Sequence, residues 1–170
     1  MLVSLACLLC SHMAHADPIH AVADGAFWHH DSGWIFPEKI GEFTRVGAAQ
    51  DVAGSSEAVA HYAAFASGSR IVASVHVYPA DSDTAQSESE SGKLLTDGAF
   101  VLGNAQALSA TKRIYVETDP GELIAIYLVT AGEWRVRVRF SGAPAKTMPS
   151  LDAFVLGQRW ETLTSAQTLR

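Results

Sequence analysis

Two runs of alternating apolar and polar residues give the clearest structural signal in the chain. Residues 57–65 and 71–79 each alternate with a period of two, and a short segment containing Gly68 separates them. This pattern predicts a β-hairpin with one buried face. The predicted core face carries Ala58, Ala60, Tyr62, Ala64, Ile71, Ala73, Val75 and Val77. The other face carries Glu57, Val59, His61, Phe65, Val72, Ser74, His76 and Tyr78.

A second hairpin is predicted nearer the C-terminus. Residues 122–130 and 133–141 flank Ala131 and Gly132, which predict a tight turn. The first run is apolar on both faces, so we expect it to be a central strand. The second run has the most regular alternation in the chain. Its apolar side carries Trp134, Val136, Val138 and Phe140, and its polar side carries Arg135, Arg137 and Arg139.

Two helices are predicted from other patterns. Ser87 and Glu90 fit a capping box, and apolar residues from 94 to 102 recur at helical spacing, which predicts a helix over about 87–102. Near the C-terminus, Thr147 is predicted to cap a short helix over about 148–157. Its inward side chains would be Leu151, Phe154 and Val155.

These elements together predict an α+β fold, with a mostly antiparallel twisted sheet of about six to seven strands and two helices packed on it. We expect one domain over residues 34–160, after a surface arm at 17–33 and before a frayed tail at 161–170. The residues predicted to be buried together are Tyr62, Val75, Val77, Ile126, Trp134, Val138 and Phe154.

The N-terminus has the layout of a secretory signal peptide. Residues 1–16 contain no Lys, Arg, Asp or Glu, and a short apolar run precedes Ala14-His15-Ala16, a small-x-small cleavage pattern. The run is shorter than the roughly 20 apolar residues that a membrane-spanning helix needs. We therefore expect cleavage near Ala16 and a periplasmic or secreted product without a membrane span. Both cysteines, Cys7 and Cys10, would leave with the signal, so thiol chemistry is not expected.

The composition is that of a globular domain. The chain has 170 residues, of which 48% are hydrophobic and 18% charged, and its formal net charge is −6. The negative charge argues against nucleic acid as a partner, since phosphate binding relies on Lys and Arg. The sequence contains no phosphate-binding loop, no nucleophile elbow and no zinc-protease motif, so we assign no catalytic residue and no cofactor.

Short motifs carry a resemblance to a known group of proteins. Trp34-Ile-Phe-Pro, followed by Ile40-Gly41-x-Phe43-x-Arg45, resembles the opening of small exported proteobacterial proteins of unknown function. Their first hairpin likewise ends in a pattern similar to Val75-His-Val-Tyr78-Pro79. The predicted order of elements resembles the Mog1/PsbP-like fold. The resemblance implies an accessory or assembly role and brings no site residues, because fold does not fix function.

His61 and His76 are the candidate metal ligands. The predicted pairing places them on one face of adjacent strands, opposite or diagonal to each other, where Cβ separations run from about 4.5 to 8 Å. Two imidazoles can converge on a metal ion over that distance, with Glu57 and Tyr78 as additional oxygen ligands. The simpler alternative is that each histidine bonds a neighbouring side chain or water.

Arg135, Arg137 and Arg139 are the candidate ligand-binding residues. Alternate positions on one strand place three guanidinium groups in a row, about 6.6 Å apart. Such a row suits a carboxylate, a phosphate or an acidic partner. Alternatively, the arginines pair with glutamates of the protein itself or lay their stems over neighbouring apolar residues. The glutamates considered are Glu57, Glu117 and Glu122, and the apolar residues are Ile124, Ile126 and Leu128.

The sequence therefore favours a non-enzymatic, exported binding or accessory module that acts through a sheet face. Its partner would be an anionic ligand or an acidic protein surface. The alternative function is a small periplasmic enzyme or metal-binding protein built around His61 and His76.

Overall fold

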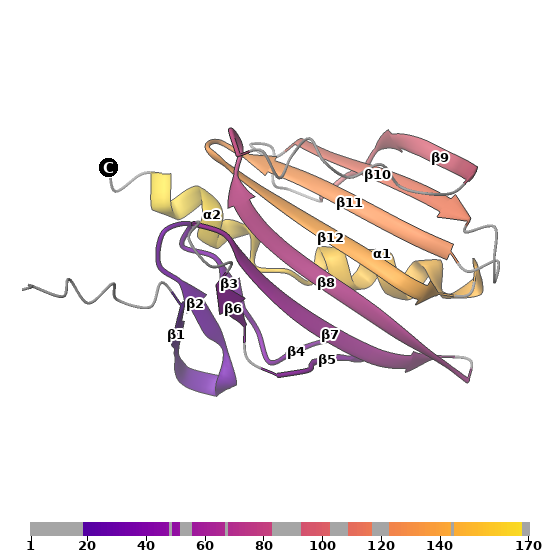
Figure 1. The fold of residues 1–170 in the computed structure, drawn as a ribbon, viewed down its shortest axis with the longest axis horizontal. Coiled ribbons are helices and arrows are strands. Elements are labelled where there is room, and N and C mark those ends of the chain that lie inside the picture. The colour runs from indigo at the N-terminus through magenta and orange to yellow at the C-terminus, as the bar shows by residue number, and fades with distance from the viewer. Residues whose placement is uncertain are drawn as a thin grey trace, which may run out of the picture.

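The computed structural model describes residues 19–47, 49–51, 56–66, 68–82, 93–102, 109–116, 123–143 and 145–167. Within these ranges the chain forms two antiparallel sheets, two 3-10 turns and two short α-helices (Figure 1). None of the helices in these ranges is long and apolar enough to cross a membrane. The predicted signal peptide at residues 1–16 lies outside the described residues.

The small sheet is built from residues that were predicted to form a surface arm and from the segment just after it. Its strands are β1 (Ile19–Ala21), β2 (Phe27–His29) and β3 (Ile35–Phe36), in that order. The 3-10 turn η1 (Ala23–Gly25) joins β1 to β2. The chain then enters the large sheet through β4.

The large sheet has nine strands in the described residues. Its strands are β4 (Lys39–Ile40), β5 (Phe43–Arg45), β6 (Gln50–Asp51), β7 (Ala58–Ala66), β8 (Ser69–Pro79), β9 (Lys93–Ala99), β10 (Ser109–Val116), β11 (Leu123–Ala131) and β12 (Trp134–Ala143). Eight of them follow the order β4-β5-β7-β8-β12-β11-β10-β9, and β6 pairs with β7. Every pairing is antiparallel.

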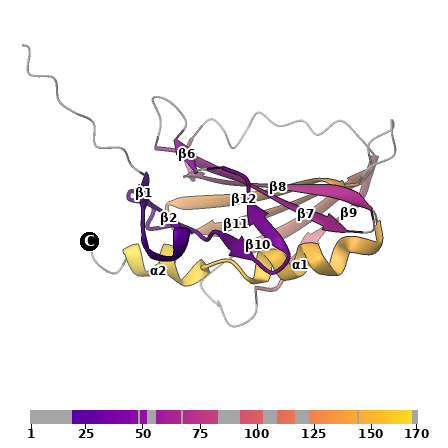
Figure 2. The same cartoon turned by 90° about the horizontal axis from the view of Figure 1, so that it is seen from below.

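Both α-helices lie at the C-terminal end of the chain and cover the same face of the large sheet (Figure 2). After the 3-10 turn η3 (Ala145–Thr147), α1 spans Met148–Leu156 and α2 spans Trp160–Gln167. The predicted helix over 148–157 is confirmed, with Leu151, Phe154 and Val155 buried and Gly157 at its C-cap. Thr147 stands at the N-cap, but its side chain makes no capping hydrogen bond.

The predicted α+β class is wrong, because the fold is dominated by strands. The main error is the predicted helix over 87–102: its described part forms β9, which pairs with β10 at the edge of the sheet. Leu94 and Leu95 are both exposed, so their spacing does not mark the buried stripe of an amphipathic helix. Gly98 further disfavours a helix, and pairing with β10 satisfies the backbone of the segment instead.

The two predicted hairpins are confirmed. In the first, Ala58 pairs with Val77 and Ala60 with Val75, which gives the expected division of faces. In the second, β11 lies between β12 and β10, as expected for a strand that is apolar on both sides. Of the residues predicted to be buried together, all but Ile126 belong to the main core. Ile126 lies opposite Arg139 and faces away from the helices.

Candidate functional site

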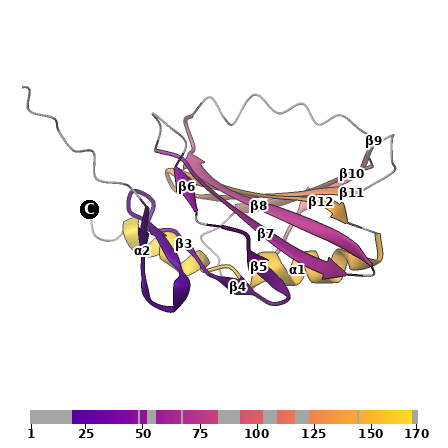
Figure 3. The same ribbon diagram turned by 60° about the horizontal axis from the view of Figure 1, so that its bottom comes forward.

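The arginine face is the side of the large sheet that carries Arg135, Arg137 and Arg139, opposite the side covered by α1 and α2 (Figure 3). The alternation along β12 produces this face: Trp134, Val136, Val138 and Phe140 are buried in the core, so the intervening arginines point away from it. Each arginine is half-buried. The predicted common orientation of the three residues is therefore present.

The neighbours of the three arginines come from the strands on either side of β12. On β8, Arg135 lies opposite Tyr78, Arg137 opposite His76 and Arg139 opposite Ser74. On β11, the opposite residues are Thr130, Leu128 and Ile126. Two of these, Leu128 and Ile126, are among the apolar residues predicted to lie beneath the arginine stems. The row is thus bordered by polar residues on one strand and mostly apolar residues on the other.

His76 links the arginine row to a buried carboxylate. Its Nε2 atom lies 3.0 Å from Oε2 of Glu57, just before β7, and its Nδ1 atom lies 3.4 Å from Nη2 of Arg137. A guanidinium only donates hydrogen bonds, so Nδ1 of His76 must accept. The proton of a neutral imidazole then sits on Nε2 and is donated to Glu57. The contacts define one tautomer of a neutral His76.

These two contacts connect Glu57, just before β7, to His76 on β8 and to Arg137 on β12. Glu57 is 5% exposed and His76 is 9% exposed, so both ring nitrogens and the carboxylate need partners inside the protein. Glu57 was one of the glutamates predicted to pair with the arginines. Its carboxylate contacts His76, and His76 in turn contacts Arg137. The other two, Glu117 and Glu122, lie outside the described residues. The contact with His76 orients Arg137 on the arginine face.

Arg135 occupies a different environment at the start of the row. It lies opposite Tyr78, which is 3% exposed, and its Nε atom is buried without a hydrogen-bond partner in the described part of the chain. A buried N–H group without an acceptor is costly.

The two candidate metal ligands bond different neighbours. His61 lies opposite Ser74 and its Nδ1 atom is 2.9 Å from the Ser74 hydroxyl oxygen, while His76 lies opposite Val59 and bonds Glu57. The two histidines are therefore diagonal on one face, as predicted, but each contacts a different neighbour. No group of three or more His, Cys, Asp or Glu in the described ranges is arranged to hold a metal ion.

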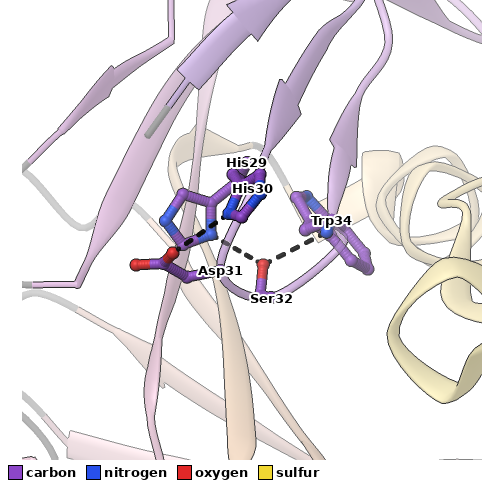
Figure 4. A network of polar contacts seen from close by, with 5 residues as sticks. All are labelled: His29, His30, Asp31, Ser32 and Trp34. Carbon is purple, nitrogen blue, oxygen red and sulfur yellow. Dashed lines mark hydrogen bonds and ion pairs between the residues drawn. The ribbon is translucent and has the colours of Figure 1, made fainter. Parts of the chain in front are cut away.

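A second polar network closes the turn between β2 and β3 (Figure 4). The Ser32 hydroxyl oxygen accepts the backbone N–H of Trp34 at 3.1 Å and lies 2.7 Å from Nδ1 of His29. Both His29 and Ser32 are fully buried, so the serine is not accessible as a nucleophile. His30 points elsewhere and lies 3.4 Å from Asp31. No sequence pattern predicts this role of Ser32.

Burial controls the charge of His29. Desolvation lowers the pKa of His29 from 6.5 to about 4, and the nearby Asp31 only partly opposes this. The imidazole is therefore neutral at pH 7. Its ring packs at right angles to that of Trp134, with 5.6 Å between centroids. The network joins the small sheet to the start of β12.

A third polar cluster joins α1 to the covered face of the sheet. Nζ of Lys112 lies 2.6 Å from Oδ1 of Asp152, and the Tyr127 hydroxyl donates to the same oxygen. Lys112 also lies over the rings of Tyr127 and Phe100. Burial and the neighbouring Asp152 carboxylate raise the pKa of Tyr127. The three bonded residues are distant in sequence, so no local sequence pattern predicts the cluster.

Comparisons with known proteins identify no relative. Neither the scan against protein families nor the searches of curated proteins and of solved structures found a match. The resemblance to small exported proteins and to the Mog1/PsbP-like fold therefore stays a prediction.

The buried imidazole of His29 makes a testable contribution to stability. The folded-state pKa of His29 lies below the unfolded value of 6.5. As the pH falls from about 6.5 to 4, the unfolded state therefore binds a proton that the folded state does not, and the free energy of unfolding decreases. We expect the wild type to lose up to about 3 kcal/mol of unfolding free energy from this group over that range. His29→Asn, which can still bond Ser32, should remove this pH-dependent component. Urea unfolding at several pH values measures the difference.

The control for that experiment is His20→Asn, because His20 is exposed and is not among the charges that shift the pKa of His29. The control should follow the wild-type pH dependence. If His29→Asn also follows the wild-type curve, the assignment of this effect to His29 is wrong.

The carboxylate of Glu57 should stabilise the protein through His76. Glu57→Ala removes the acceptor of the buried Nε2–H group, and we expect a loss of about 1–3 kcal/mol in unfolding free energy. Glu57→Gln should cost less, because its amide oxygen can still accept. The control Glu42→Ala, at an exposed position, should change little. Equal stability of the two Glu57 variants would contradict the assigned hydrogen bond.

Proposed function

We propose that this protein is an exported binding or accessory module whose arginine face binds an anionic ligand or an acidic protein surface. The carrying observation is the row of three co-facial, half-buried arginines on the side of the sheet opposite both helices, with Arg137 oriented by His76. An oriented guanidinium loses less conformational freedom on binding than a mobile one.

The spacing of the row suits an extended anion. Alternate residues on a strand are about 6.6 Å apart, so neighbouring guanidinium groups can bind separate carboxylates or phosphates. Carboxylates on an extended acidic peptide recur with a similar period. A row on a strand therefore favours a polyanion over a single small ion.

The contacts favour binding over the enzyme or metal alternative. That alternative needs His61 and His76 to act on one substrate or metal ion. His61 instead bonds Ser74, and His76 bonds Glu57 and Arg137. The imidazole of His76 serves to orient an arginine in this arrangement.

The binding proposal is tested with two probes, poly-L-glutamate and citrate, titrated calorimetrically at low and high salt. We expect binding that weakens with salt, because the contacts involve charges near solvent. Arg135→Gln and Arg139→Gln should each weaken it by roughly 1.5–3 kcal/mol, the range for a hydrogen bond to a charged group. Thermal unfolding of each variant checks that the fold is retained.

Arg159→Gln is the matched control, since it removes the same charge from an exposed position between α1 and α2. It should leave the affinity nearly unchanged. An equal loss of affinity in Arg159→Gln would show that the weaker binding reflects the overall charge of the protein and not the arginine face. Absence of binding to both probes would contradict the proposal. Poly-L-glutamate binding without citrate binding would favour an acidic protein surface as the partner.

Export is tested separately. We propose that the chain is cleaved after Ala16 and reaches the periplasm or the medium, on the basis of the N-terminal pattern. N-terminal sequencing of protein from the periplasm of a Gram-negative host should begin at Asp17. Protein that retains Met1 and stays in the cytoplasmic fraction would contradict this proposal.

A further inference from the structure

A pocket of about 440 Å³ lies at one end of the large sheet, where β12 begins at Trp134. The end of β8 and the turn between β11 and β12 lie side by side there (Figure 1). The residues that line it are Pro79, Ala80, Asp81, Glu133 and Trp134. Its volume is within the range of about 300–1,000 Å³ that small-molecule sites occupy.

Backbone contacts fix the walls of this pocket. Trp134 lies opposite Pro79 in the β8–β12 ladder, and the backbone N–H of Ala80 donates to the carbonyl of Glu133 at 2.8 Å. The Trp134 ring packs against that of His29, which meets it at 85°. Trp134 is 9% exposed, so only a small part of it is accessible. The site is therefore formed before any ligand arrives.

The lining combines an aromatic ring with two carboxylates. Asp81 and Glu133 are both exposed, and both line the pocket together with Trp134. Indole is the strongest of the aromatic side chains in attracting a cation, and a carboxylate adds charge attraction. Pro79 and Ala80 supply apolar surface for a hydrocarbon group. This chemistry suits a small organic cation.

We propose that this pocket binds a small alkylammonium or quaternary ammonium compound. A hard cation such as Ca²⁺ takes 6–8 oxygen ligands and gains little from an indole or a proline. An organic cation uses all three kinds of surface present: the ring, the carboxylates and the apolar side chains. The site is independent of the proposed anion binding, because Trp134 and Arg135 point to opposite sides of β12.

The proposal is tested by NMR with choline and its uncharged isostere 3,3-dimethylbutanol. The probe signal is the indole N–H resonance of Trp134, identified by its loss in Trp134→Phe. We expect choline to shift this resonance saturably and dimethylbutanol to shift it far less. Asp81→Asn and Glu133→Gln should each weaken choline binding about two- to fivefold, as for an exposed ion pair.

These two variants alter exposed side chains and keep the backbone bond between Ala80 and Glu133, so both should fold. Glu42→Gln, which removes the same charge from an exposed turn between β4 and β5, should leave choline affinity unchanged. Equal binding of choline and dimethylbutanol would overturn the cation assignment. Displacement of choline by an equal concentration of Ca²⁺ would reassign the pocket to a metal ion. Absence of any shift with choline would overturn the site.

Discussion

The packing of Phe154 on the large sheet decides which face of that sheet is the inside of the molecule. Phe154 projects from α1 and meets the rings of Phe43, Tyr62 and Phe140, with centroid distances of 4.7, 5.2 and 5.5 Å. These rings come from β5, β7 and β12, so one helix side chain joins strands far apart in sequence. Truncating a buried Phe costs roughly 3–5 kcal/mol, a large part of the stability of a typical domain.

The orientation of every charged residue on β12 follows from this packing. A strand whose even-numbered positions are buried under α1 must present its odd-numbered positions to the other side. Arg135, Arg137 and Arg139 are thereby placed on the arginine face. The sheet cannot slip by one residue without bringing them into an aromatic core, where an unpaired charge is very costly. The arginine row is therefore fixed by the same contacts that stabilise the core.

Several polar contacts near the core join residues that are far apart in sequence, and this limits what sequence patterns reveal. The hairpins and the common face of the arginines were predictable, because a period of two is a local property of the chain. The pairing of Lys112 with Asp152 was not, since it depends on where α1 lands on the sheet. The burial of His29 also depends on distant packing, against Trp134. Local spacing misled at β9, because exposed leucines mimic a helical stripe and pairing with β10 supplies the deciding backbone bonds.

The geometry of β12 also separates the two proposed sites energetically. The strand begins at Trp134, beside the acidic pocket, and carries the arginine row along its opposite face. A ligand at one site would influence the other through side-chain contacts only if β12 shifted or rotated. β8 and β11 pair with β12 on both sides along most of its length, so such a shift would break backbone hydrogen bonds on two edges at once. Discrete alternative arrangements are what carry coupling between sites, and a strand held on both edges has none close in energy. Occupation of the pocket should therefore leave the anion affinity of the arginine face unchanged, apart from the weak, salt-screened effect of one added positive charge.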